Sequence, residues 1–317
     1  MATQRHSFSL LPFLPFLAIL AATACQDRKS QSDYVAEILK ERQDYNQRLR
    51  SDSYSALALV YRQYLKDSAR LTIGSSDAAD VHLVGGDIAP VHAVIEGASL
   101  APTLRAEGSA TFFSGDTPPR QLTQLTLNGE TKFRIGRFPL LYRINPPWGR
   151  TLEVFDPETP AFREFTAVEF FPIDPAYRVP GEVVPYQKPE QVILIDSQGL
   201  EQPWWLYGAL RFRLQQVDSR LELYTLTLEP EEIHKEGFML IFTDATSGKE
   251  TFPGTRYLYV EGKMAGTITV DFNRTFNPPC IYSPVYTCAF PRPQNRLPIA
   301  IRAGALWYRQ AQSEPRP

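Results

Sequence analysis

The feature that most constrains the fold is a series of short apolar segments that begins near residue 70 and recurs about every eight to fifteen residues. Gly-Gly, Asn-Gly and Pro-Pro turn signals separate these segments. This spacing is typical of an all-β sandwich and not of βαβ units, whose strands alternate with long helices. The predicted strands are Leu71–Ile73, Val81–Val84, Ala93–Glu96, Thr111–Phe113, Leu125–Leu127, Phe133–Ile135, Leu140–Ile144 and Leu152–Phe155.

A second β-rich section is expected from about Ala167 to Ala305. Because no linker rich in Pro, Gly or Ser separates it from the first section, we expect the two to pack as one body. Its predicted strands are Val192–Ile195, Trp204–Phe212, Leu221–Leu228, Phe238–Phe242, Tyr257–Val260 and Gly266–Phe272.

Two helices are expected before residue 70. Apolar residues recur at helical spacing in Tyr34–Leu49, and Ser55–Leu65 is predicted to be a second helix. The predicted fold is therefore mainly β, with N-terminal helices, a β-sandwich and a second β-rich section.

Residues 1–25 are predicted to be an export signal. An apolar run from Phe8 to Leu20 follows Arg5 and is too short to span a bilayer. Ala22-Thr23-Ala24-Cys25 then resembles a lipobox, with Ala22 where leucine is usual, so Cys25 is the expected lipidation site. The alternative is an ordinary signal peptide with an A-x-A cleavage site, in which Cys25 has no role.

The expected organisation follows from these boundaries. Gln26 after the cysteine favours the outer membrane, facing the periplasm, with the lipid as the membrane contact. The segments are a signal peptide with lipobox (1–25), a tether (26–33), a helical segment (34–69), the sandwich (70–165), the C-terminal β-rich region (166–306) and a tail (307–317).

Composition describes a packed body without a nucleic-acid partner. Hydrophobic residues make up 43% of the chain and charged residues 21%, which is enough apolar material for a core. The 33 Lys and Arg residues are balanced by 35 Asp and Glu residues, and there is no basic stripe. No metal or other cofactor is expected, because the standard catalytic and ligand-binding motifs are absent from the sequence.

Cys280 and Cys288 remain after Cys25 is assigned to lipid. In an oxidising compartment a disulfide between them is favoured, and it would close a proline-rich loop. Free thiols and a zinc pair are the alternatives, although no C-x-x-C motif or nearby His completes a zinc site.

The segment I-G-S-S-D-A-A-D-V-H-L, followed by I-A-P-V-H-A-V-I, resembles part of a forkhead-associated domain, a β-sandwich that reads phosphothreonine. The resemblance covers about 25 residues. Ser75 stands where that family has its phosphate-binding Arg, and Ala89 where it has Ser, so we expect the sandwich without the phosphopeptide activity. The retained His92 is predicted to tie loops together.

The C-terminal polar block, residues 242–304, mixes Asp, Asn, Arg, Pro and Cys with aromatic residues in loop-like segments. Together with F-F-P-I-D-P-A-Y-R-V-P at Phe170–Pro180, it resembles the bacterial DUF1684 family over roughly Tyr34 to Gly304. That family has no established activity to transfer. Its usual A-G-E-K ending is Ala303-Gly304-Ala305-Leu306 here, so a catalytic role of that Glu or Lys would be lost.

Two interpretations of the polar block remain open. In one, its side chains line a single pocket, with Arg256 gripping an anion and the carboxylates acting as acid and base or binding a cation. In the other, Arg256 pairs with a carboxylate and the remaining side chains brace long loops. The candidate residues are Asp244, Glu250, Arg256, Asp271, Asn273, Asn277 and Asn295.

The favoured function is a non-catalytic envelope lipoprotein whose β-rich body binds a small ligand or an envelope protein. The alternative is a small-molecule enzyme of hydrolase type that uses the Asp, Glu and Arg residues of the polar block. Convergence of Asp244, Arg256, Asp271 and Asn295 on one deep pocket would favour the enzyme or a ligand binder, and dispersed, mutually paired side chains would favour a purely structural role for these residues.

Overall fold

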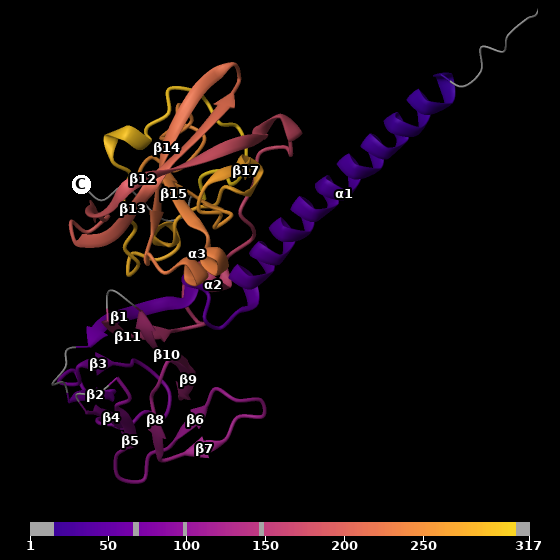
Figure 1. Ribbon diagram of the computed structural model, residues 1–317. Helices are drawn as coiled ribbons and strands as arrows, with labels where there is room; N and C mark the ends of the chain where they lie inside the picture. Colours follow the sequence, from indigo (N-terminus) through magenta and orange to yellow (C-terminus); the bar gives the residue numbers. More distant parts are fainter. Residues whose placement is uncertain (1–15, 66–69, 98–99, 146–148, 309–317) are drawn as a thin grey trace, which may run out of the picture. The chain divides into compact units, whose positions relative to one another are not determined.

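A computed structural model describes residues 16–65, 70–97, 100–145 and 149–308 (Figure 1). The first part of the predicted export signal and most of the predicted tail lie outside these ranges. The chain divides into two compact units, Met1–Gln43 and Asp44–Pro317. Helix α1 (Phe16–Ser51) includes Cys25 and the predicted tether. Within the described residues, no helix combines the length and apolarity needed to cross a membrane.

The prediction of a second helix over Ser55–Leu65 is wrong. A 3₁₀ turn, η1 (Ala56–Ala58), is followed directly by strand β1 (Leu59–Leu65), which pairs with a later strand. Apolar spacing in a segment this short fits either a helix or a strand. The segment L-V-Y-R-Q-Y-L carries β-branched and aromatic residues, which suit a strand, and the available sheet edge decides the outcome.

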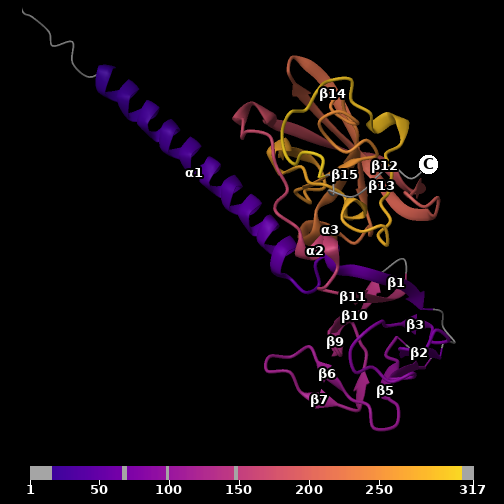
Figure 2. The same cartoon turned by 180° about the vertical axis from the view of Figure 1, so that it is seen from behind.

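The predicted mainly β fold is confirmed, and its first section consists of two sheets that share one core (Figure 2). The larger sheet has the strand order β1, β11 (Gly149–Phe155), β10 (Phe138–Asn145), β9 (Glu130–Ile135), β6 (Phe112–Ser114) and β7 (Gln121–Leu122). The smaller has the order β3 (Val81–His82), β2 (Leu71–Gly74), β4 (Ala93–Glu96), β5 (Thr103–Ala106) and β8 (Gln124–Thr126). Ile73 and Leu104 from one sheet pack with Phe133 and Leu140 from the other, all fully buried.

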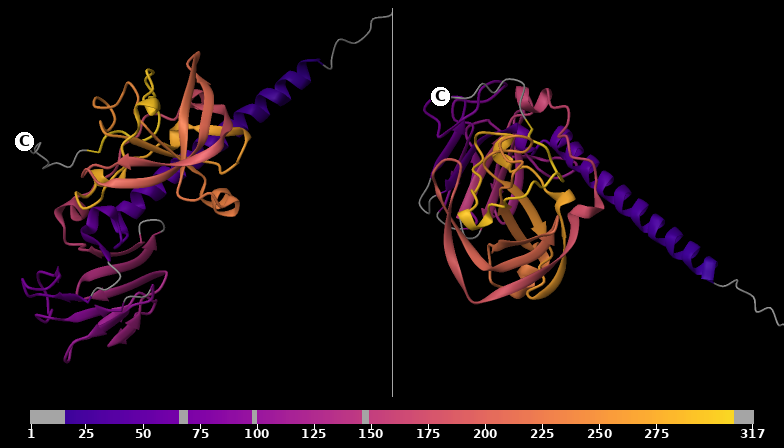
Figure 3. Two further views of the ribbon diagram at one scale, coloured as in Figure 1. Left: turned by 60° about the vertical axis from the view of Figure 1, so that its left-hand side comes forward. Right: turned by 90° about the horizontal axis from the view of Figure 1, so that it is seen from above.

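The C-terminal section contains one six-stranded sheet with long, bent strands (Figure 3). Leu258 and Val260 at one edge and Ile268 and Val270 at the other edge belong to the same core cluster, so the sheet curls around that core. The strand order is β16 (Arg256–Val260), β15 (Phe238–Phe242), β14 (Val217–Thr225), β13 (Glu201–Leu214), β12 (Arg178–Ile195) and β17 (Gly266–Asp271). Short helices lie between the strands: α2 (Pro160–Arg163), η2 (Pro175–Tyr177) and α3 (Pro230–Glu236).

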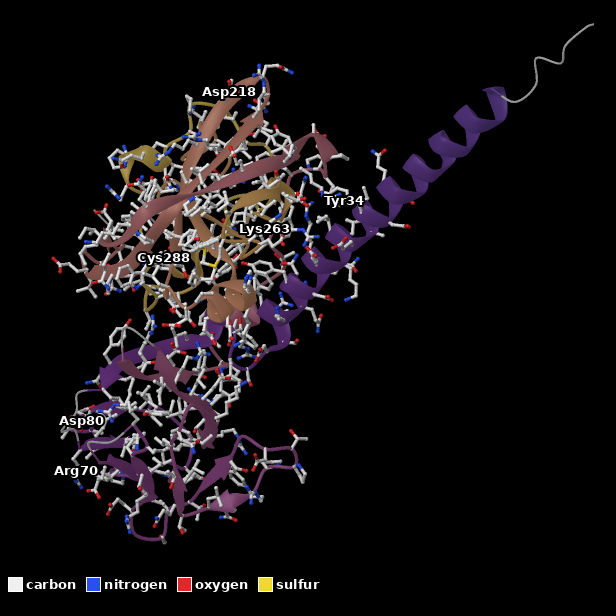
Figure 4. All side chains as sticks on the ribbon, in the orientation of Figure 1. Tyr34, Arg70, Asp80, Asp218, Lys263 and Cys288 are labelled. Atoms are coloured by element: carbon white, nitrogen blue, oxygen red, sulfur yellow. A yellow bond between two sulfur atoms is a disulfide. The ribbon has the colours of Figure 1, made fainter. Side chains whose placement is uncertain are left out.

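After β17 the chain continues as a long irregular segment, in which Leu297, Ile301 and Ala303 belong to the core that the sheet encloses. It contains three 3₁₀ turns, η3 (Phe272–Arg274), η4 (Pro279–Ile281) and η5 (Pro293–Asn295). Cys280 and Cys288 form a disulfide with their Cα atoms 5.8 Å apart, and Figure 4 labels Cys288 beside it. Cys288 and Ala289 pack with Trp204 and Leu206 of β13.

The loop closed by this disulfide also contacts the sandwich. The Ser283 hydroxyl donates a hydrogen bond of 2.8 Å to the Leu59 carbonyl, and the Arg62 guanidinium lies 5.7 Å from the centre of the Tyr286 ring. At the end of α1, the Tyr45 and Tyr282 hydroxyls are 2.8 Å apart. The loop therefore joins the two β-rich sections and the last turns of the helix.

Replacing Cys280 and Cys288 by Ser is expected to lower the free energy of unfolding by about 2–3 kcal/mol, because the open loop gains entropy in the unfolded chain. Chemical denaturation of the intact chain, with and without reductant, measures this difference. The double variant should not respond to reductant. Alkylation of both cysteines in denatured but unreduced protein would contradict the disulfide.

Candidate functional site

The centre of the polar block is a buried ion pair between Arg256, the first residue of β16, and Asp244, two residues after β15. Arg256 Nη1 lies 2.5 Å from Asp244 Oδ2, and the two side chains are 2% and 0% exposed. Adjacent antiparallel strands bring these residues together, because β15 pairs with β16 through Phe242 and Arg256. Burial lowers the pKa of the Arg256 guanidinium, and the neighbouring Asp244 opposes that shift.

The Nη atoms of Arg256 also hold residues 301–303 by donating to their backbone carbonyls. Nη1 donates a second hydrogen bond of 2.9 Å to the Ile301 carbonyl, and Nη2 donates to the Ala303 carbonyl. Gly304 follows with φ +77°, and a Cβ there would lie 2.5 Å from the Thr275 carbonyl oxygen. The close turn at Gly304 therefore keeps these carbonyls within reach of the guanidinium.

Both carboxylate oxygens of Asp244 also accept hydrogen bonds inside the protein. Its Oδ1 accepts hydrogen bonds of 2.6 Å from both the backbone N–H and the hydroxyl of Thr246. The Thr246 hydroxyl lies 2.8 Å from that of Thr251, across the tight turn. Both oxygens of the carboxylate are thus turned into the protein, and neither is presented to a ligand.

Asn295 completes the sheet where β14 and β15 diverge. These strands pair directly at Tyr224 and Met239, and two residues further along this antiparallel register Glu222 falls opposite Ile241. The Asn295 amide lies between those two residues: its Oδ1 accepts from Glu222 N at 2.7 Å and its Nδ2 donates to Ile241 O at 2.9 Å. A fully buried side-chain amide therefore replaces the missing backbone bonds of the ladder.

Asp271 and Asn273 lie together and brace a separate loop. Asp271 caps η3 by accepting from Asn273 N at 3.0 Å and is 3.3 Å from the Arg274 guanidinium. Asn273 Oδ1 accepts from Asp174 N at 3.1 Å, and its Nδ2 donates to Asp174 O at 2.8 Å. This pair of bonds fixes the Phe170–Pro180 segment beside the polar block.

Glu250 and Asn277 hold the last described residues. Both Glu250 oxygens lie 3.1 Å from Arg302 Nε in a solvent-exposed pair. Asn277 Nδ2 donates to Leu306 O at 2.8 Å. Ala305, which stands where the family has Glu, is 2% exposed in an apolar cluster with Tyr282.

The seven candidates therefore do not form one site. Asp244 pairs with Arg256 and Asp271 with Asn273, whereas Glu250, Asn277 and Asn295 each brace a different segment. A pocket of about 390 Å³ lies beside the central pair, and Asp244 is the one candidate that lines it. Among residues that the structure describes, no group of three His, Cys, Asp or Glu side chains could hold a metal ion.

Glu222 is another buried carboxylate of this region, and it is absent from the candidates identified from the sequence. Tyr224 donates a 2.6 Å hydrogen bond to Glu222 Oε2, and the Arg292 guanidinium lies 3.6 Å from the same oxygen. Burial raises the pKa of Tyr224, and the hydrogen bond to Glu222 adds to that shift. The signal was available as Glu and Tyr at alternate positions of a strand, but nothing in the sequence identifies Arg292 as their partner.

His92 of the sandwich is buried between two loops. Ala89 N donates to His92 Nδ1 at 3.3 Å, so Nε2 carries the proton and donates to Thr111 O at 2.8 Å. A shallow pocket of about 630 Å³ beside it includes Asp87 and Glu107, and no Lys or Arg lines it. The likeness to a forkhead-associated domain stays a prediction.

These features define a β-rich protein whose most distinctive polar residues brace its C-terminal loops. Residues 163–305 match the model of DUF1684, described as a protein of unknown function, which confirms the predicted resemblance over this shorter region. A solution NMR structure of an uncharacterized protein of Haloarcula marismortui is 28% identical, covers 48% of this chain and 82% of that chain, and gives a TM-score of 0.40. No curated protein matches the chain.

Arg256→Ala is expected to lower the free energy of unfolding by about 3–5 kcal/mol, because it leaves Asp244 buried and unpaired. Arg256→Lys should also be destabilising, since a single ammonium cannot reproduce the planar fork. Urea denaturation measures both. The matched control is Arg302→Ala, which breaks an exposed pair and should leave stability nearly unchanged. A fully stable Arg256→Ala would contradict the bracing role.

Asn295→Asp is expected to cost about 2–4 kcal/mol, because the carboxylate cannot donate to the Glu222 and Ile241 carbonyls and adds a buried charge. Hydrogen exchange should show loss of protection at Thr243 N and Leu297 N, whose backbone bonds join this loop to the end of β15, whereas amides of the sandwich should keep theirs. Unchanged protection at both amides would show that the sheet does not need this side chain.

Proposed function

We propose that the protein is a lipoprotein of the cell envelope whose β-rich body binds a small ligand or an envelope protein without catalysing a reaction. The observation that carries the non-catalytic part is that both Nη atoms of Arg256 and both carboxylate oxygens of Asp244 have partners inside the protein. Arg256 donates to Asp244 and to two backbone carbonyls, and Asp244 accepts from Arg256 and Thr246. A general base or an anion clamp must present its polar atoms to a substrate, and these atoms face one another.

The alternative, a hydrolase-like enzyme using the Asp, Glu and Arg residues, receives less support from this arrangement. Arg256 and Asp271 lie in different hydrogen-bond networks, and Asn295 is consumed by the β14–β15 junction. Catalysis would require these side chains to leave partners that hold the C-terminal loops.

The anchoring part of the proposal is carried by the sequence. Cys25 follows an apolar run and small residues, as the modified cysteine of a lipoprotein does. Gln26 supports the outer membrane, with the body in the periplasm. The compartment would also be oxidising, which suits the disulfide between Cys280 and Cys288.

Cys25→Ala is expected to move the protein from the membrane fraction to the soluble fraction and to abolish labelling by a palmitate analogue in cells. In the wild-type protein, the acyl chains attached at Cys25 would hold the body at the membrane. The control is the double replacement of Cys280 and Cys288 by Ser, which should keep the label. Absence of label in the wild-type protein, or unchanged membrane association of Cys25→Ala, would sink the anchoring proposal.

A further inference from the structure

We propose that the pocket beside the Arg256–Asp244 pair binds a small carboxylate with an apolar body, such as an aromatic acid. The pocket has a volume of about 390 Å³, within the usual size range for small-molecule sites. This inference rests on the proposed ligand-binding function and assigns it a site and a ligand class.

The pocket forms where three distant segments meet. Thr243 N donates to Asn295 O at 3.1 Å and Leu297 N donates to Thr243 O at 2.8 Å, so residues 295–297 run beside the end of β15. This pairing places Arg296 next to Thr243, and both line the pocket. Phe290 and Pro291 contribute from the segment that follows Cys288.

The charge of the pocket is positive. Arg296 is exposed, and within the described residues it makes no ion pair. The acidic groups nearby are already neutralised, since Asp244 faces Arg256 and Glu222 faces Arg292. An anion is therefore the ligand charge that Arg296 favours, and its planar fork matches a carboxylate in two parallel hydrogen bonds.

The walls select an apolar body for that anion. Phe290 is 37% exposed and lines the pocket, so its ring offers apolar surface to a bound ligand. Gly254 lies against it, and a Cβ there would come within 2.7 Å of the Phe290 ring and 2.9 Å of the Phe252 ring. The glycine thus keeps the two rings close together at the side of the pocket.

Hydroxyl groups supply the remaining polar contacts. Ser247 also lines the pocket, and its Oγ accepts a 3.1 Å hydrogen bond from Asp244 N, which leaves its own proton to donate. Ser247 and Thr243 therefore give the site neutral donors beside one cation. This combination suits a singly charged ligand better than a phosphate, which calls for several cationic or backbone donors.

The test uses the purified full-length chain and two probes of the same shape, benzoate and benzamide, in saturation-transfer NMR titrations. Benzoate should bind at millimolar concentration, and benzamide should bind at least several-fold more weakly because it lacks the charge. Arg296→Ala should weaken benzoate binding about tenfold or more, the effect of losing one charge-assisted contact. Arg296→Lys should bind benzoate more weakly than the wild type and more strongly than Arg296→Ala.

Arg211→Ala is the matched control, because Arg211 is exposed on β13 and lies outside the pocket. It should bind benzoate as the wild type does, and thermal unfolding should show that Arg296→Ala stays folded. Equal binding of benzoate by wild type and Arg296→Ala, or no binding of benzoate to the wild type, would overturn the inference. Membrane release of Cys25→Ala is a separate measurement from benzoate binding. A wrong anchoring proposal and a wrong pocket proposal can therefore be distinguished.

Discussion

The C-terminal half of this protein depends on one buried guanidinium. Arg256 connects the β15–β16 edge of the sheet, through Asp244, to the carbonyls of Ile301 and Ala303. The segment after β17 has few backbone ladder bonds of its own, so side chains must satisfy its polar groups. Arg256 can do this for three acceptors at once because its donors are fixed in a planar fork. The pocket, the disulfide loop and the last described residues all lie next to the segments that Arg256 holds.

Much of the fold follows from the sequence, and the failures have definite causes. Strands such as Phe238–Phe242 and Gly266–Asp271 were predictable from apolar runs and alternation. Leu59–Leu65 was not, because its apolar spacing fits a helix as well as a strand. The first half of β12 was hidden by Pro180 and Pro185, which lack the N–H of a ladder residue. Pro180 lies before the pairing with β13 begins at Gly181, and the register becomes irregular directly after Pro185.

The candidate site was predictable in its composition and unpredictable in its geometry. The pairing of Arg256 with a carboxylate was one of two open interpretations of the sequence, and the structure supports it. Partners more than about forty residues away, such as Ile301 for Arg256 and Glu222 for Asn295, leave no local pattern. Their contacts come from the curl of the sheet and the path of the loop across it, which a single sequence does not specify.

The most direct test of the buried Arg256–Asp244 pair is a double-mutant cycle with Arg256→Ala, Asp244→Ala and the two combined. Denaturant unfolding measures the free energy of unfolding of each variant. If the pair is a buried brace, either single change strands a charge, and the double variant recovers part of the loss. We expect a coupling free energy between Arg256 and Asp244 of at least about 2 kcal/mol. Additive single effects, or single variants as stable as the wild type, would show that Arg256 and Asp244 are not held for each other.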